Sequence, residues 1–262
     1  MNNMPAKILF LVFFNIPFLL FAKPEKKTGE FYQVTVYHFS GAEQQKLIEQ
    51  YLQDAYLPAL HRQQIKNVGV FTAIANDTVT DKRLYLIMPL KSLQEAAELP
   101  GLLAKDKEYQ ATGKAYLDAA FKTPPYSRLE NILLQAFPLA PFLILPKLTG
   151  PRTERVYELR SYEGYTEKIF QNKVQMFNEG GEIDLFKRLN FNAVFYASVI
   201  AGSRMPNLMY MTSFENMADR DAHWKDFGAA PDWKKISSMP EYQNNVSHID
   251  DIFLRATAYS DY

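Results

Sequence analysis

The sequence of 262 residues predicts an α+β fold made of two tandem ferredoxin-like units, each with the order β-α-β-β-α-β. Two observations lead to this prediction. An apolar strand that runs into an N-cap residue and then into a helix occurs twice, over residues 84–93 with Ser92 as the cap and over residues 208–217 with Asn216 as the cap. Strand and helix patterns also follow one another in the same order around both copies.

The first unit is predicted over residues 31–137. Its opening segment, residues 31–39, has the β-branched and aromatic content of a strand. Apolar residues on one side of a 3.6-residue repeat predict a helix over residues 42–64. The remaining elements are strands at residues 67–75 and 83–90, paired as a hairpin, a helical region over residues 92–121 that is interrupted at Pro100-Gly101, and a strand over residues 126–137.

The second unit is predicted over residues 154–262 and repeats this order. Its elements are a strand at residues 155–162, a helix at residues 166–178 that stops at Gly180-Gly181, a hairpin of residues 192–201 and 208–214, a helical region at residues 217–239 in two pieces around Pro231, and a strand at residues 248–258. Between the units, residues 138–153 form a linker that is rich in proline and strongly apolar. Because solvated linkers are polar, we expect Phe142 to Leu145 to pack on one or both units.

Residues 1–22 have the pattern of a signal peptide. A lone Lys7 precedes an apolar run of about 15 residues that Asn15 and Pro17 interrupt, which is short for a bilayer-spanning helix. Cleavage after Ala22 would give a secreted or periplasmic protein with no stable membrane span. An uncleaved N-terminal anchor is the alternative, because Leu20 is bulkier than the residue that signal peptidase prefers.

Charge and cysteine content exclude several classes of function. Lys plus Arg and Asp plus Glu both number 29, so no global field attracts a phosphate backbone and nucleic acid is not an expected partner. The chain has no cysteine, which removes disulfides, thiolate metal sites and thiol nucleophiles. The fold must therefore rest on its hydrophobic core.

Catalytic and cofactor motifs are absent from the sequence. The four histidines, His38, His61, His223 and His248, lie on separate predicted elements without a spacing typical of metal ligands. No nucleophile elbow, P-loop or dinucleotide fingerprint is present. We therefore assign no catalytic residue and expect neither a metal nor another cofactor.

The candidate ligand-binding residues lie in the second unit. Asn216 to Trp224 is the densest polar and aromatic segment, and it contributes His223 and Trp224; its alternative role is a capped helix with Trp224 and Trp233 as core anchors. Strand alternation places Glu158 and Arg160 on one face. This pair is either a structural salt bridge or the polar end of a ligand pocket. The full set of candidates is Glu158, Arg160, His223, Trp224 and Trp233.

Four segments of the second unit carry a family resemblance. Residues 156–162 (VYELRSY), 184–189 (DLFKRL), 214–224 (FENMADRDAHW) and 231–235 (PDWKK) together resemble the NIPSNAP family. The first unit is similar to a degenerate copy, which retains residues 56–62 (YLPALHR) but lacks the Glu-Leu-Arg step and both tryptophans. The resemblance implies a dimeric α+β barrel in which two ferredoxin-like sheets pack face to face, here within one chain.

A recognisable fold without a catalytic template predicts a non-catalytic binding or interaction module for a small hydrophobic ligand or a protein partner. The alternative is a cofactor-free monooxygenase or isomerase that acts on a small hydrophobic or aromatic substrate in the barrel, and a haem-binding barrel is a third possibility. Assembly into a homo-oligomer is left open. Because the second unit keeps the family motifs, we expect any site to lie around it.

Overall fold

The computed structural model describes residues 29–262, so the predicted signal peptide lies outside the described residues. The first half of the chain begins with β1 (Phe31–Phe39) and a long helical segment made of α1 (Ala42–Tyr51), the π-helical turn η1 (Leu52–Tyr56) and α2 (Leu57–Arg62). The strands β2 (Gly69–Ala73) and β3 (Lys82–Leu90) follow, with the 3₁₀ turn η2 (Ile74–Asp77) between them. The helices α3 (Leu93–Leu103), α4 (Lys107–Thr112) and α5 (Lys114–Leu117) lead to β4 (Arg128–Ala136).

The second half has the same order of elements. It consists of β5 (Val156–Glu163), α6 (Glu167–Asn178), α7 (Glu182–Arg188), the hairpin of β6 (Phe195–Ala201) and β7 (Asn207–Phe214), α8 (Met217–Ala229), α9 (Pro231–Ser238), the 3₁₀ turn η3 (Pro240–Tyr242) and β8 (His248–Ala256). The predicted caps are confirmed, since Ser92 accepts from the Glu95 amide and Asn216 from the Asp219 amide. The break between α8 and α9 falls just before Pro231, as predicted.

One predicted helix break is in the wrong place. The break expected at Pro100-Gly101 does not occur, because α3 continues through Pro100 to Leu103. Proline removes only one backbone donor, and the Pro100 carbonyl still accepts from the Ala104 amide at 3.0 Å, so the helix continues past it. The helical region is interrupted instead before α4, where Asp106 caps the new helix by accepting from the Tyr109 amide.

The eight strands form a closed barrel with the order β1-β3-β2-β8-β5-β7-β6-β4, and every pair is antiparallel. The predicted α+β class is therefore confirmed. Two seams join the halves, β2 with β8 and β4 with β6. The β2–β8 seam is short, pairing only Phe71, Thr72 and Ala73 with Ala256, Arg255 and Leu254.

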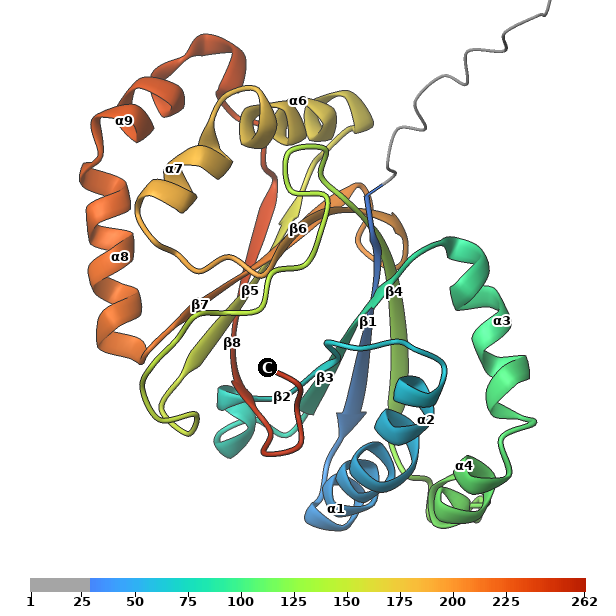
Figure 1. The fold of residues 1–262 in the computed structure, drawn as a ribbon. Coiled ribbons are helices and arrows are strands. Elements are labelled where there is room, and N and C mark those ends of the chain that lie inside the picture. Colours follow the sequence, from blue (N-terminus) through green and yellow to red (C-terminus); the bar gives the residue numbers. More distant parts are fainter. Residues whose placement is uncertain (1–28) are drawn as a thin grey trace, which may run out of the picture.

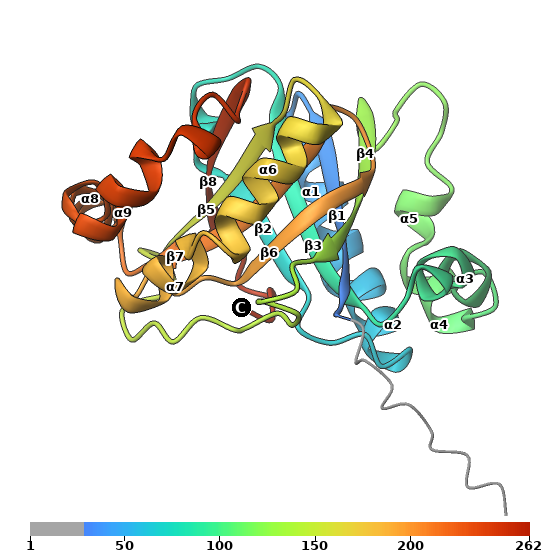
Figure 2. The ribbon, with the colours of Figure 1, turned by 90° about the horizontal axis from the view of Figure 1, so that it is seen from above.

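Helices cover the barrel on two opposite sides, with α1 to α5 outside the strands of the first half and α6 to α9 outside those of the second (Figures 1 and 2). Strand alternation produces this arrangement, since successive side chains point inward and outward. Three apolar clusters result. One fills the barrel interior, and one lies under each helical layer. No helix of residues 29–262 is both long enough and apolar enough to cross a membrane.

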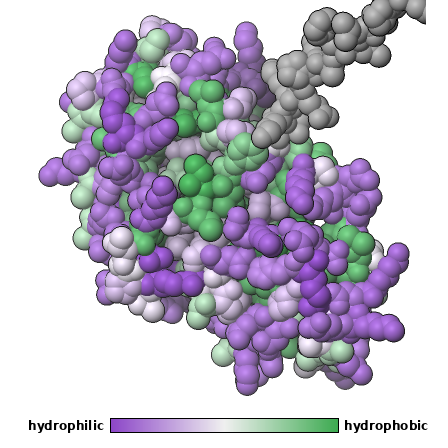
Figure 3. Space-filling view, in the orientation of Figure 1, coloured by the Kyte–Doolittle hydropathy of each residue, from purple (hydrophilic) through white to green (hydrophobic). Residues whose placement is uncertain are grey.

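The linker packs less completely than the sequence predicts. Leu143 packs on the cluster in the barrel interior, and its amide donates to Oε2 of Glu30 at 2.7 Å. Phe142, Ile144 and Leu145 are exposed instead, as is Leu139, so the expectation for residues 142–145 is wrong for three of the four. Apolar side chains gather in the middle of the face along which the linker runs (Figures 1 and 3). The linker forms neither helix nor strand, so no regular face directs its side chains toward the core.

Candidate functional site

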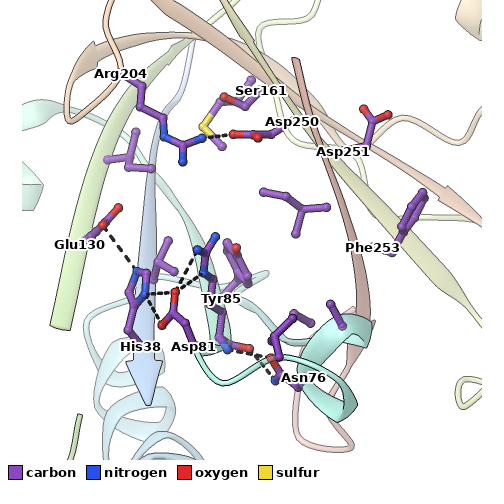
Figure 4. Close-up of a pocket in the computed structure, with 18 of the residues that line it drawn as sticks. His38, Asn76, Asp81, Tyr85, Glu130, Ser161, Arg204, Asp250, Asp251 and Phe253 are labelled. Carbon is purple, nitrogen blue, oxygen red and sulfur yellow. Dashed lines mark hydrogen bonds and ion pairs between the residues drawn. The ribbon is translucent and has the colours of Figure 1, made fainter. Parts of the chain in front are cut away.

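One end of the barrel encloses a cavity of about 820 Å³ (Figure 4). Inward-facing side chains of β1, β3, β4, β5, β7 and β8 form its walls, and the segment from Ala73 to Asp81 borders it. Both halves of the chain therefore contribute to it. The polar and charged side chains that line it include those of His38, Asn76, Asp81, Arg83, Glu130, Arg204, Asp250 and Asp251. Its less polar walls include Val36, Tyr85, Ile132, Met209 and Ile252.

The cavity exists at this end because the two ends of the barrel are filled differently. At the far end, the ring of Tyr262 packs against Phe71 with ring centroids 5.2 Å apart and joins the interior cluster. Gly69 makes room there, since a Cβ at this position would lie 2.5 Å from Cε2 of Phe71. At the near end, β2 ends at Ala73 and η2 follows, so within residues 29–262 the part of β8 from His248 to Phe253 has no strand partner on that side.

A histidine, two carboxylates and an arginine form a chain of contacts in the cavity wall. Nδ1 of His38 lies 2.9 Å from Oδ1 of Asp81, and Nε2 of His38 lies 3.5 Å from Oε1 of Glu130. Arg83 donates to Oδ2 of Asp81 from Nε at 3.1 Å and from Nη2 at 3.0 Å. Figure 4 shows His38, Asp81 and Glu130 side by side. The strand register explains the proximity, because His38 on β1 is paired with Arg83 on β3.

The charges of this chain set the hydrogen-bonding roles of His38. Burial opposes ionisation of Asp81, but the hydrogen bonds from His38 and Arg83 outweigh burial and hold the pKa of the Asp81 carboxyl below its usual value. An ionised carboxylate only accepts hydrogen bonds, so Nδ1 of His38 is the donor in this contact. In the neutral ring, Nε2 is therefore an acceptor. It is buried and has no hydrogen-bond partner among the described residues.

The opposite wall carries Arg204, whose guanidinium pairs with Asp250 (Figure 4). The same guanidinium lies 3.9 Å from Oε1 of Glu163. His248 Nε2 approaches Asp250 Oδ1 at 3.1 Å. Glu163, His248 and Asp250 offer three atoms within 4.8 Å of one another, which is a spacing that a metal ion could bridge. The guanidinium of Arg204 already compensates the charge of Asp250, however, so this cluster does not require a metal. The sequence-based expectation of no metal stays a prediction.

The predicted pair Glu158 and Arg160 lies outside the barrel, between β5 and α8. Glu158 is fully buried and accepts from Arg160 Nη1 at 2.7 Å, from Arg220 Nη2 at 2.8 Å and from Trp224 Nε1 at 2.7 Å. Burial opposes ionisation, yet the bonds from Arg220, Trp224 and Arg160 hold the pKa of the Glu158 carboxyl below its usual value. The guanidinium of Arg160 also lies over the Trp224 ring, 4.5 Å from its centroid. These contacts hold α8 against β5.

Comparison with known proteins bears on this half of the molecule. The family model described as NIPSNAP matches residues 157–261, which is the region from β5 to the end of the described chain. Residues 157–261 form a NIPSNAP domain. The resemblance inferred from the sequence is confirmed. Glu158 and Arg160 lie at the N-terminal end of this domain. No curated protein matches the sequence with significance.

Solved structures support the barrel fold beyond the NIPSNAP domain. A candidate monooxygenase of Lactobacillus acidophilus superposes with a TM-score of 0.57 at 12% identity and covers 87% of this chain and 94% of its own. A candidate monooxygenase of Fusobacterium nucleatum gives a TM-score of 0.55 at 7% identity, with coverages of 87% and 93%. An anthrone oxidase-like protein gives 0.50 at 11% identity, with coverages of 89% and 92%. At these identities the comparisons establish the fold alone.

The other predicted residues of the NIPSNAP domain belong to its outer aromatic layer. His223 packs edge-on against Phe191, 5.6 Å between ring centroids, and its Nδ1 lies 2.8 Å from the Asp219 carbonyl oxygen. Trp233 packs on Phe227 at 4.6 Å. The structure thus brings Glu158, Arg160 and Trp224 together and holds His223 and Trp233 in the packing around them. None of the five lines the barrel cavity.

Sequence reasoning missed His38, Asp81 and Glu130, which come from the half of the chain without the NIPSNAP match. His38 and Asp81 are 43 residues apart, and only closure of the barrel brings Arg204 and Asp250 across from them. One signal was present in the sequence. Tyr32, Val34, Val36 and His38 occupy alternate positions of one strand, so all four side chains lie on the same face. Because the first three are apolar, this pattern predicts that His38 also faces inward. The cavity is lined by both halves of the chain, and the expectation that a site lies around the second unit stays a prediction.

Proposed function

We propose that the protein binds a small, largely apolar molecule with a hydroxyl or other acidic proton in the barrel cavity. A volume of about 820 Å³ is within the range of small-molecule sites, which are typically roughly 300–1,000 Å³. Apolar walls with a few convergent polar groups are also typical of such sites. This proposal keeps the binding-module function expected from the sequence and moves its location into the barrel.

The observation that carries the proposal is Nε2 of His38. The His38 residue is only 8% exposed, and its Nε2, which lies 3.5 Å from Oε1 of Glu130, makes no hydrogen bond within residues 29–262. Buried polar atoms are almost always paired, because an unpaired one costs about 1–3 kcal/mol. A ligand hydroxyl that donates to Nε2 would remove this cost. The Asp81 carboxylate on Nδ1 favours the same tautomer.

Binding of 4-nitrophenol, measured by calorimetry, tests the proposal. His38→Leu should weaken binding about tenfold, because the acceptor for the phenol hydroxyl is lost. His223→Leu is the matched control, since His223 lies in the outer layer of the NIPSNAP domain and should leave the affinity unchanged. If 4-nitrophenol does not bind, or binds equally well to the wild type and the His38 variant, the proposal is wrong.

A cofactor-free monooxygenase or isomerase is the second candidate, and the His38–Asp81 pair favours it. A neutral imidazole held by a carboxylate can act as a general base. In an isomerase, Nε2 would remove a proton from one carbon and return it to another. In a monooxygenase, Nε2 would take a C–H proton from a methylene group, dioxygen would accept the electrons, one oxygen atom would form the new C=O group, and the other would leave as water.

Oxygen uptake in the presence of anthrone tests this second candidate, and the choice of substrate follows the anthrone oxidase-like protein with a similar fold. If His38 is the base, His38→Leu should abolish the enzyme-dependent part of the uptake and of anthraquinone formation, while His223→Leu should keep it. Ligand binding without any turnover by the wild-type protein would leave the binding module as the function and reject the monooxygenase.

We also propose that the chain is an internal duplication in which two ferredoxin-like units form a dimeric α+β barrel. The strand order supports this, because β4-β1-β3-β2 and β8-β5-β7-β6 repeat the same arrangement within one closed sheet. Each unit covers the inner face of the other, so neither sheet is left exposed.

The segment of residues 1–22 supports a further proposal, that the protein is exported and cleaved after Ala22. N-terminal sequencing of the protein from its own host should then begin at Lys23. An intact Met1 on the mature protein would favour the uncleaved anchor instead.

A further inference from the structure

A second cavity, of about 410 Å³, lies in the first half of the chain and outside the barrel. It is enclosed between the outward faces of β1 and β4 and the helices α1, α3, α4 and α5. Five tyrosines and four neutral polar residues line it, together with small and aliphatic side chains; the tyrosines are Tyr37, Tyr51, Tyr56, Tyr109 and Tyr116, and the polar residues are Gln33, Thr35, Gln110 and Asn131. The barrel wall separates it from the cavity of His38.

The tyrosines of this cavity are in contact with one another. The rings of Tyr51 and Tyr116 stack with centroids 3.8 Å apart and planes 6° apart, and those of Tyr51 and Tyr56 stack at 5.6 Å and 18°. The hydroxyls of Tyr51 and Tyr109 are hydrogen-bonded at 2.9 Å. This tyrosine cluster therefore presents both ring surfaces and hydroxyls at one cavity.

A π-helical turn places two of these rings together. In η1 the Leu57 amide donates to the Leu52 carbonyl, which is the i to i+5 pattern. Residues five apart lie on different faces of an ordinary α-helix, but the wider turn brings Tyr51 and Tyr56 onto one side. Single π turns are rare and occur frequently at functional sites. The turn thus links an unusual backbone feature directly to the wall of the cavity.

The sheet beside the tyrosine cluster carries polar side chains, of which Thr35 is buried, Gln33 is partly buried and Asn131 is exposed. Oδ1 of Asn131 accepts from Oγ1 of Thr35 at 2.7 Å and from Nε2 of Gln33 at 3.1 Å. Both bonds use the amide oxygen, so within residues 29–262 the Asn131 Nδ2 group has no protein acceptor. None of the residues that line this cavity is charged. A charged ligand would therefore lose hydration without compensation.

The corresponding layer of the NIPSNAP domain provides a comparison within the same molecule. There, under α6 to α9, fully buried phenylalanine rings fill the space, including Phe177, Phe186 and Phe191. In the first half, an aliphatic core also lies under the helices, and tyrosines and amides border a cavity beside it.

We propose that the tyrosine cluster is a second ligand site, which binds a neutral molecule of one or two rings with hydroxyl or carbonyl groups. The ring stacks on tyrosine, and the ligand's polar groups bond to the amides of Asn131 and Gln33 and to tyrosine hydroxyls. This site is independent of the proposed function of the barrel, because the two cavities share no lining residue.

The test uses two neutral probes and one charged probe, each titrated against the full chain by nuclear magnetic resonance. Phenyl β-glucoside represents sugar rings, coumarin represents neutral aromatic rings, and phenyl phosphate carries the negative charge. We expect at least one neutral probe to bind and phenyl phosphate not to bind. The two neutral probes distinguish sugar from aromatic ligands, and either result supports the proposal.

Two variants of α3 locate the binding. Ala96 lines the cavity, whereas the neighbouring Ala97 is exposed and does not. Ala96→Phe should fill the cavity and weaken binding about tenfold or more, while Ala97→Phe should leave it unchanged. Tyr116→Leu should weaken binding about three- to tenfold through the lost stacking, and Tyr165→Leu on the second half is its control.

Several results would overturn this proposal. They are failure of both neutral probes to bind the wild type, equal affinity for the Ala96 and Ala97 variants, or tighter binding of phenyl phosphate than of the neutral probes. A change in affinity on His38→Leu would assign the probe to the barrel instead. That result would reject the second site and leave the proposed function of the barrel standing.

Discussion

Nδ1 of His38 lies 2.9 Å from Oδ1 of Asp81 at the mouth of the barrel cavity. Of the two partners, His38 is nearly buried and Asp81 is about half exposed, with side-chain exposures of 11% and 49%. The carboxylate therefore remains hydrated on one side while it fixes the orientation and tautomer of a buried ring. A histidine held in this way can serve a ligand through its other nitrogen.

We expect Asp81→Asn to weaken 4-nitrophenol binding by several-fold without unfolding the protein. The amide no longer requires Nδ1 to be the donor, so Nε2 is the acceptor in only part of the population. Calorimetry at neutral pH measures the effect. Asp77→Asn is the control, because Asp77 lies in η2 and does not line the cavity. An unchanged affinity for the Asp81 variant would mean that the carboxylate does not set the tautomer.

Filling the barrel cavity should abolish ligand binding. Ile132 lines the cavity on β4, so Ile132→Phe places extra volume where the probe would lie. Leu133→Phe on the same strand is the control, since Leu133 does not line either cavity. Calorimetry should show loss of 4-nitrophenol binding for the first variant only. Retained binding by Ile132→Phe would place the ligand elsewhere.

Glu158→Gln should destabilise the folded protein by about 3–5 kcal/mol, because it removes one partner of a buried ion-pair network and leaves Arg160 without full compensation. Urea unfolding followed by circular dichroism measures the free energy of unfolding. Asp221→Asn breaks only the exposed end of the network, at Arg220, and should cost no more than about 1 kcal/mol. Equal costs would show that burial does not distinguish the two pairs.

Glu158 should also make the free energy of unfolding depend on pH in the acidic range. Its pKa in the folded protein lies below the ordinary value of 4.5, so the unfolded chain binds protons more readily. The stabilisation by Glu158 is thus fully present above pH 4.5 and is lost as the pH falls through the folded-state pKa. The free energy of unfolding should fall less steeply with acid in Glu158→Gln than in the wild type. An identical acid slope in both proteins would contradict this assignment.

The buried pair of Lys173 and Glu182 predicts a strong coupling in a double-mutant cycle. Nζ of Lys173 lies 2.9 Å from Oε2 of Glu182, with both side chains nearly inaccessible. Lys173→Met and Glu182→Leu should each lower the free energy of unfolding by about 3–5 kcal/mol, because each leaves the other charge buried without a partner. The double variant should recover most of that loss. Urea unfolding of the four proteins measures the coupling. Additive losses would show that the two charges do not interact.

Local patterns in the sequence predicted the elements well. Strand alternation, N-caps such as Ser92 and Asn216, and proline at the start of α9 depend on neighbours within a few residues, which the sequence displays directly. The NIPSNAP motifs were readable for the same reason. The exposure of the linker side chains and the continuation of α3 through Pro100 differ from the sequence-based predictions. Both depend on which groups find partners in the folded chain.

The sequence by itself determined the α+β class, the order of the elements and the residues that face inward. Tertiary structure alone decided where the candidate site lies. Glu158 and Arg160 looked like a ligand site because a charged pair on a half-buried strand needs partners, and α8 supplies those partners through Arg220 and Trp224. His38 looked isolated, but pairing of β1 with β3 and β4 placed it beside Asp81 and Glu130, and barrel closure enclosed these residues in a cavity. The physical reason is that burial and pairing of a charge are set by contacts between residues distant in the chain.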